Sequence, residues 1–196
     1  MLLLESDEQI REFLEKVVTR SGVLVVGAGN ELRCDDGFGV YVARALQNLL
    51  TRYSGRRSLA VIDAGTALES YLDLMSSSEV TILLDVVEAP APFSKVILLQ
   101  KHEIPSYSDA LSTHSIGLGT LLNLISGDVY VIGTRPACLD FKVGVSSPVA
   151  EVIQALIRVF IDVLIDHEYL NETLKNIRKS KYGGSPQHTH ETSLTA

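Results

Sequence analysis

Two neighbouring aspartates, a third aspartate and a histidine stand where a cation could be bound. Asp35 and Asp36 follow the glycine-rich segment GAGNEL. Asp85 ends an apolar run, and His114 lies where a later helix is expected to begin. Carboxylates and an imidazole form a mixed oxygen and nitrogen ligand set, which suits a borderline divalent metal such as nickel, zinc or manganese. Two acids and one histidine also leave coordination positions open for a substrate or for water.

A dinucleotide-binding loop is the alternative interpretation of the glycine-rich segment. Leu32 stands where the third glycine of that fingerprint is required, and Asp63 comes later than the acid that would hold a ribose. Asp35 and Asp36 would also place negative charge against a pyrophosphate. The residues therefore favour a cation over an anion, and nucleotide binding is the minority interpretation.

Each candidate residue also has a purely structural interpretation. Asp35 or Asp36 can cap the helix that follows, because a carboxylate pairs with the free amide groups of a first helical turn. Asp63 precedes a turn and is expected to brace it through backbone amides. His114 can be a surface residue of a helix. Asp85 is harder to explain in this way, since an acid that ends so apolar a run needs a partner or a purpose.

The chain contains only two cysteines, Cys34 and Cys138, which are far apart in the sequence. Their number and spacing fit neither a disulfide framework nor a CxxC zinc site. Neighbouring carboxylates disfavour the thiolate of Cys34, so an inert loop cysteine is expected. The pattern predicts a reducing compartment, and we expect a cytoplasmic protein.

Apolar runs and helical spacing predict the elements that position these side chains. Strands are expected at 23–29, 59–65, 79–89, 95–100 and 128–136. Helices separate them, except between the third strand and the fourth, which we therefore expect to run antiparallel at an edge. The alternation predicts a three-layer α/β fold, with a twisted, mostly parallel five-stranded sheet and helices on both faces. Ligands of such sheets bind beyond the carboxyl ends of the strands, where the candidate residues fall.

Length and composition indicate one domain and exclude several classes of partner. The 196 residues suit a single domain over 1–168 that includes an N-terminal helix at 6–20. An extension at 169–196 is expected to be disordered in its last part. A net charge of −7 without a basic stripe argues against nucleic acid as a partner. No apolar stretch is long enough to span a membrane, and the N-terminal leucines are too few for a signal peptide.

Five segments, taken in order, resemble the motifs of the hydrogenase maturation endopeptidases. The opening motif of that family is a glycine-x-glycine-asparagine loop followed by an aspartate and a second acid, and GAGNELRCDDGFGV matches it. The other matching segments are VIDAGTALESYLDLM, VTILLDVVEAPAPFSKVILL, STHSIGLGTLL and IGTRPACLDFKVGVSSPVAEVI. The resemblance covers about residues 23–165, and motifs in the right order are far more specific than any one of them. Val86 departs from the pattern, because the family usually has alanine there.

The resemblance implies a peptidase that removes a C-terminal extension from the large-subunit precursor of a [NiFe] hydrogenase. The nickel would arrive with that precursor and be recognised by two acids and a histidine. By position in the motifs, these are Asp36, Asp85 and His114. Asp36 and Asp85 are also the candidate catalytic residues, through either aspartic-type or metal-assisted hydrolysis. The alternatives are a non-proteolytic metal or precursor chaperone and, less favoured, a nucleotide-binding protein.

Overall fold

A computed structural model describes residues 1–51, 59–104 and 118–182, with side chains described as far as residue 164. The chain divides into a compact unit, Met1–Val163, and a second unit, Leu164–Ala196. The first unit contains the whole sheet and the segments on which the candidate aspartates lie. In the part of the chain that the structure describes, no helix is long and apolar enough to cross a membrane.

A six-stranded sheet forms the centre of the fold, in the order β1-β5-β6-β4-β2-β3. The strands are β1 (Leu2–Leu4), β2 (Val23–Ala28), β3 (Leu59–Gly65), β4 (Val80–Val86), β5 (Val96–Gln100) and β6 (Asp128–Thr134). β6, β4, β2 and β3 run parallel, whereas β1 and β5 are antiparallel to their neighbours. The α/β fold and its antiparallel edge are thus confirmed, with one strand more than the five predicted.

The additional strand is β1, which covers the edge where β5 was expected to lie. Leu2 pairs with Leu98 and Leu4 pairs with Val96. Only Leu4 is buried among the leucines of β1, so the run has no alternation long enough to identify it as a strand. Its structure comes from pairing with a segment more than ninety residues away, which no local pattern reveals.

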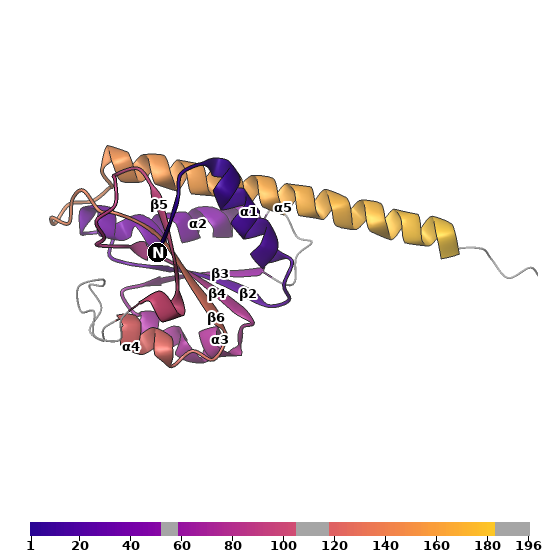
Figure 1. Ribbon diagram of the computed structural model, residues 1–196, viewed down its shortest axis with the longest axis horizontal. Helices are drawn as coiled ribbons and strands as arrows, with labels where there is room; N and C mark the ends of the chain where they lie inside the picture. Colours follow the sequence, from indigo (N-terminus) through magenta and orange to yellow (C-terminus); the bar gives the residue numbers. More distant parts are fainter. Residues whose placement is uncertain (52–58, 105–117, 183–196) are drawn as a thin grey trace, which may run out of the picture. The chain divides into compact units, whose positions relative to one another are not determined.

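Helices cover both faces of the sheet (Figure 1). α1 (Asp7–Val18), α2 (Phe38–Leu50) and the first part of α5 (Ser147–Tyr182) lie on one face, and α3 (Leu72–Ser77) and α4 (Leu118–Asn123) lie on the other. Every residue of β2 and β4 is buried, as expected for parallel strands that are covered on both sides. Asp85 lies near the end of β4, and Asp35 and Asp36 lie in the loop that follows β2.

The N-terminal helix α1 begins after a side-chain cap at Ser6 and ends at Val18, close to the predicted range of 6–20. The side chain of Ser6 accepts a hydrogen bond of 3.3 Å from the backbone N–H of Gln9. The side chain of Gln9 in turn accepts one of 2.7 Å from the backbone N–H of Glu5. Beyond the helix, Gly22 adopts a φ of 76°, which favours glycine at this turn into β2.

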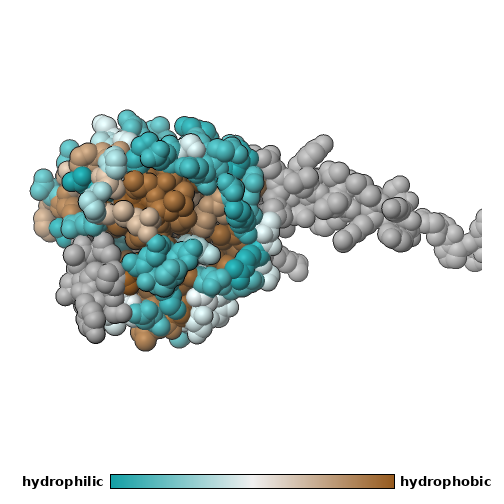
Figure 2. Space-filling model, viewed as in Figure 1, coloured by the Kyte–Doolittle hydropathy of each residue, from teal (hydrophilic) through white to brown (hydrophobic). Residues whose placement is uncertain are grey.

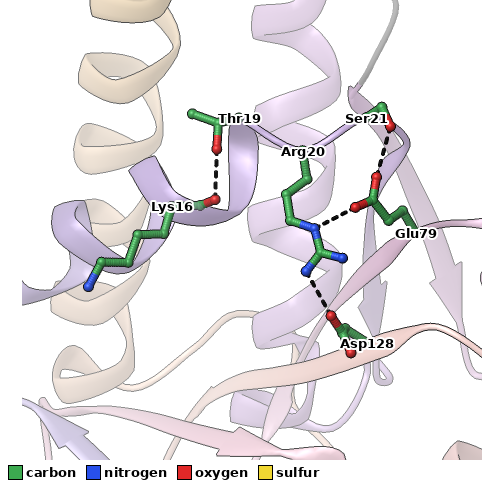
Figure 3. Close-up of polar contacts among 6 residues, drawn as sticks. All are labelled: Lys16, Thr19, Arg20, Ser21, Glu79 and Asp128. Carbon is green, nitrogen blue, oxygen red and sulfur yellow. Dashed lines mark hydrogen bonds and ion pairs between the residues drawn. The ribbon is translucent and has the colours of Figure 1, made fainter.

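A group of polar side chains ties the end of α1 to the amino ends of β4 and β6 (Figure 3). Arg20 donates a hydrogen bond of 2.6 Å to Glu79 and one of 2.7 Å to Asp128, and Ser21 donates one of 2.8 Å to Glu79. The hydrogen bond from Arg20, and after it that from Ser21, lowers the pKa of Glu79. This group lies at the edge of the sheet opposite to the carboxyl ends of β2 and β4, so it supports the fold and not the candidate site.

Candidate active site

The connection from β2 to α2 carries Asp35 and Asp36, and glycines shape it. It contains a 3₁₀ turn, η1 (Cys34–Gly37), directly before α2. Gly29 has a φ of 124°, and a Cβ atom there would lie 1.8 Å from the carbonyl oxygen of Asp36. A Cβ atom on Gly39 would lie 2.0 Å from the carbonyl oxygen of Leu84. Gly29 therefore lets the loop fold back onto Asp36, and Gly39 lets α2 approach β4, which explains these glycines without a phosphate.

Asp36 is buried inside this turn, with only 1% of its surface exposed. Its Oδ2 atom accepts a hydrogen bond of 3.1 Å from the backbone N–H of Asn30. α2 has Gly37 at its N-cap and no side-chain cap, so the capping interpretation is wrong for Asp36 and for Asp35. The carboxylate of Asp36 is held by the loop that presents it.

Asp35 has a different role, because its carboxylate joins two segments that are distant in the sequence. It accepts hydrogen bonds from the backbone N–H groups of Ala137 (2.8 Å) and Cys138 (2.9 Å). Ser146 donates two more, from its backbone N–H (2.6 Å) and from its hydroxyl (2.8 Å). Asp35 is fully buried, and these bonds compensate for the burial of its charge. It therefore fixes η1 against the segment 137–146.

Cys34 and Cys138 form a disulfide between the same two segments, so the expectation of two unpaired cysteines is wrong. Their Cα atoms lie 5.8 Å apart although 104 residues separate them in the sequence. The pairing follows from the fold, because η1 and the segment after β6 meet at the carboxyl edge of the sheet. Neither the number nor the spacing of the cysteines could indicate this contact.

Asp85 lies near the end of β4 and is 2% exposed. Its Oδ1 atom accepts a hydrogen bond of 2.8 Å from the backbone N–H of Val86. β4 is the direct neighbour of β2, with Leu84 opposite Gly27. Asp85 and the loop that carries Asp36 consequently lie at the carboxyl ends of adjacent parallel strands, as the sequence predicts.

The predicted third member of the set, His114, lies outside the described residues. Within the described ranges, no group of three or more histidine, cysteine, aspartate and glutamate side chains comes together as a metal site. The combination of Asp36, Asp85 and His114 therefore stays a prediction. What the geometry adds is the placement of two buried carboxylates at one edge of the sheet.

Asp63, at the end of β3, has the structural role that the sequence suggested. Its Oδ1 atom accepts a hydrogen bond of 3.1 Å from the backbone N–H of Gly65. Its Oδ2 atom accepts one of 2.6 Å from Arg44, which also pairs with Glu31. The hydrogen bonds to Asp63 and Glu31 raise the pKa of Arg44 above its ordinary value. Asp63 braces its turn and belongs to a separate ion-pair group.

A cleft of about 530 Å³ opens at the carboxyl ends of β4 and β6. It is lined by Glu88, Ala89, Pro90, Arg135, Pro136, Ala137, Cys138 and Leu139. Arg135 contacts the segment that continues the opposite wall. Its guanidinium donates a hydrogen bond of 3.1 Å to the carbonyl of Ala91, and its Cζ atom lies 4.7 Å from the centroid of the Phe93 ring. One wall thus follows Asp85 in the chain, and the other is the segment that Asp35 holds.

Apolar side chains are also exposed on the loop after β2 and on the segment that follows the cleft residue Leu139 in the chain. Phe141 is 86% exposed, Val143 is 69% exposed and Leu32 is 55% exposed. They lie on the two segments that Asp35 and the disulfide join, where the backbone N–H of Lys142 also donates a hydrogen bond of 2.9 Å to the carbonyl of Leu32. Figure 2 shows an apolar area among hydrophilic side chains on the face in view. Apolar side chains held on a fixed backbone suit contact with another polypeptide.

Comparisons with known proteins are consistent with this arrangement. A family model described as hydrogenase maturation protease, HycI, matches residues 40–163. The hydrogenase 2 maturation protease of Escherichia coli is 27% identical over 141 residues, which are 67% of this chain and 84% of that protein. The coenzyme F420 hydrogenase subunit delta of Methanothermobacter thermautotrophicus is 31% identical over 147 residues, which are 71% of this chain and 92% of that protein.

A solved structure has the same fold. The [NiFe] hydrogenase maturation protease HycI from Thermococcus kodakarensis superposes with a TM-score of 0.64 and 22% sequence identity. The match covers 78% of this chain and 98% of that protein. At this level of identity the likeness supports the architecture of the sheet and its helices, and the side chains of the site have to be judged on their own geometry.

Proposed function

We propose that this chain, which belongs to the hydrogenase maturation protease family and is a peptidase, acts on the nickel-loaded precursor of a [NiFe]-hydrogenase large subunit. It removes a C-terminal extension from that precursor. The main support for this proposal is that Asp36 and Asp85 are both buried and lie at the carboxyl ends of adjacent strands. Ligands of parallel α/β sheets bind at this edge, beyond the carboxyl ends of the strands.

Recognition of nickel is the part of the proposal that explains the types of residue. Carboxylate oxygens from Asp36 and Asp85 and an imidazole nitrogen from His114 suit nickel in the precursor. Such a set leaves positions for ligands that the precursor supplies. The three side chains would then distinguish nickel-loaded from nickel-free precursor, because only the loaded precursor brings a metal that they can bind.

Two routes to hydrolysis fit these residues. Asp36 or Asp85 can act as a general base that takes a proton from the attacking water. Nickel in the precursor can instead polarise the scissile carbonyl or a bound water, with the carboxylates as its ligands. In both routes the loop that holds Asp36 must keep its carboxylate fixed, since small displacements of a catalytic group reduce the rate strongly.

The cleft gives the precursor a place to bind. It begins beyond Asp85 with Glu88 and is bounded on the other side by the segment from Arg135 to Leu139. Its volume of about 530 Å³ can receive a short length of extended chain. The exposed Phe141 and Val143, which follow Leu139 in the chain, offer apolar contacts. We propose that the extension lies in this cleft and that the cut occurs at its Asp85 end.

The experiment that tests the proposed function is incubation of purified protein with nickel-loaded precursor, followed by mass spectrometry. Loss of a C-terminal peptide supports it. A precursor that is bound and released uncut would instead identify a chaperone. Thermal stabilisation by dinucleotides without any processing would support the nucleotide-binding alternative. We also propose a cytoplasmic location.

A further inference from the structure

We propose that Cys34 and Cys138 form a reversible thiol–disulfide site. A dithiol that enters the cleft reduces the disulfide, and the oxidised form holds Asp36 in its active position. The effect on activity rests on the proposed function, whereas the thiol chemistry and the movement of the loop do not. The observations that support the proposal are the position of the disulfide, the backbone of Cys34 and the unequal exposure of the two cysteines.

The disulfide joins the loop of a candidate catalytic residue to the wall of the cleft. Cys34 opens η1, two residues before Asp36. Cys138 lines the cleft between Ala137 and Leu139. A change in this bond therefore acts on the carboxylate and on the proposed binding cleft together.

Cys34 has a backbone conformation that few residues other than glycine adopt. Its φ is 51°, in the left-handed region. The conformation is maintained by the disulfide and by a hydrogen bond of 2.7 Å from the backbone N–H of Cys34 to the carbonyl of Lys142. Strained residues of this kind persist when their surroundings hold them, and they cluster at functional sites. Opening the disulfide removes one of the two restraints on Cys34.

The two cysteines differ in their exposure to solvent. Cys34 is 2% exposed, whereas Cys138 is partly exposed on the wall of the cleft. A thiolate that enters the cleft therefore attacks the sulfur of Cys138, and the sulfur of Cys34 leaves as a thiolate and takes up a proton. The second thiol of the reductant then attacks the mixed disulfide, and the sulfur of Cys138 leaves and is protonated in turn. The dithiol loses two electrons and becomes a cyclic disulfide, and the protein gains two thiols.

Other contacts limit how far the loop moves after reduction. The hydrogen bonds of Asp35 to Cys138 and Ser146 remain, as does the bond of 3.1 Å from the backbone N–H of Asp35 to the carbonyl of Cys138. Reduction should therefore loosen η1 without unfolding the domain. This is the behaviour of a site that adjusts activity, in contrast to a disulfide on which the whole fold depends.

In a reducing compartment, disulfides are usually transient and have catalytic or redox-sensing roles. If the protein is cytoplasmic, as we propose, dithiol reductants of the thioredoxin class are the natural partners of Cys138. An oxidised protein would then hold Asp36 firmly, and a reduced one would hold it loosely.

The test uses the full chain equilibrated with reduced or oxidised dithiothreitol. Alkylation and mass spectrometry report the number of free thiols, which should change between none and two. Amide hydrogen exchange in residues 30–37 should be faster by about tenfold or more in the reduced protein, with β2 and β4 unchanged. Cleavage of the nickel-loaded precursor should fall by about tenfold or more on reduction and return on reoxidation.

The double variant Cys34→Ser/Cys138→Ser is the control. It should resemble the reduced protein and should not respond to dithiothreitol. Two free thiols under every condition, or reduction without faster exchange in 30–37, would overturn the proposal. Equal cleavage by the oxidised and reduced proteins would overturn the link to activity while leaving the proposed function intact. Absence of cleavage in both states, with the expected thiol and exchange changes, would instead reject the proposed function alone.

Discussion

The carboxylate of Asp35 accepts a hydrogen bond of 2.9 Å from the backbone N–H of Cys138, which lies 103 residues further along the chain. With the disulfide between Cys34 and Cys138, this bond joins the loop after β2 to the segment after β6. The neighbouring aspartates therefore have separate roles. Asp35 connects two parts of the fold, which leaves Asp36 as the acid that we propose for catalysis.

Replacing Asp35 by asparagine should destabilise the protein markedly. The amide cannot accept all the hydrogen bonds that the carboxylate accepts from Ala137, Cys138 and Ser146, and its NH₂ group would face backbone donors. We expect a loss of about 2–4 kcal/mol in the free energy of unfolding, measured by urea denaturation. The exposed Asp73→Asn is the matched control and should change stability little. An Asp35→Asn variant as stable as this control would contradict the role given to Asp35.

Replacing Gly29 by alanine should be more damaging than replacing Gly144. Both glycines have a positive φ, 124° and 94°, so both variants incur backbone strain of about 1–3 kcal/mol. Only at Gly29 would the new Cβ atom also meet the carbonyl oxygen of Asp36, whereas nothing lies within 4 Å at Gly144. Gly29→Ala should therefore have the lower Tm and lose precursor cleavage. Equal Tm values for the two variants would show that the Gly29 turn adapts to a side chain.

The pair of Arg20 and Glu79 should contribute stability that depends on pH. The hydrogen bond from Arg20 lowers the pKa of Glu79 below its ordinary value of 4.5. A lowered pKa in the folded state means that the contribution is complete above the ordinary value and is lost as the pH falls through the folded value. Thermal unfolding should therefore show a difference in Tm between wild type and Arg20→Gln at about pH 7 that shrinks towards about pH 3.

The partner variant Glu79→Gln provides the check on this pair. If Glu79 acts through Arg20, the double variant should be little worse at neutral pH than Arg20→Gln alone, which also loses the hydrogen bond to Asp128. Because the side chains are partly exposed, the effect should be small and should decrease with added salt. A difference in Tm that persists unchanged at low pH would assign the effect of Arg20 to packing.

Asp36→Asn and Asp85→Asn should each remove processing while leaving the fold intact. Loss of a general base or of a metal-binding carboxylate typically reduces the rate by about 10²–10⁴-fold. Asp63→Asn is the matched control, since Asp63 also ends a strand at this edge but pairs with Arg44. Circular dichroism and Tm would confirm folding, and gel or mass analysis of the precursor would report cleavage. Full cleavage by both variants would remove Asp36 and Asp85 from the site.

Much of the fold was predictable because its signals are local. The apolar runs of β2 and β4, the cap at Ser6 and the glycines around Gly29 each act within a few residues. The position of Asp85 at a strand end followed from the same patterns. Parallel strands bring their carboxyl ends together, so the common edge for Asp36 and Asp85 was predictable as well.

The features that the sequence did not reveal all depend on distant partners. β1 is a strand because β5 pairs with it, and Cys34 is in a disulfide because the fold brings Cys138 to it. The carboxylate of Asp35 has its donors more than a hundred residues away, so it was indistinguishable from a helix cap. Patterns within a short window contain no information on such contacts.

The most direct test of nickel recognition compares nickel-loaded and nickel-free precursor in the same cleavage assay. Wild-type protein should remove the C-terminal extension from the loaded precursor and leave the nickel-free precursor whole, as measured by intact mass spectrometry. Cleavage of both precursors at the same rate would contradict recognition of nickel by Asp36, Asp85 and His114.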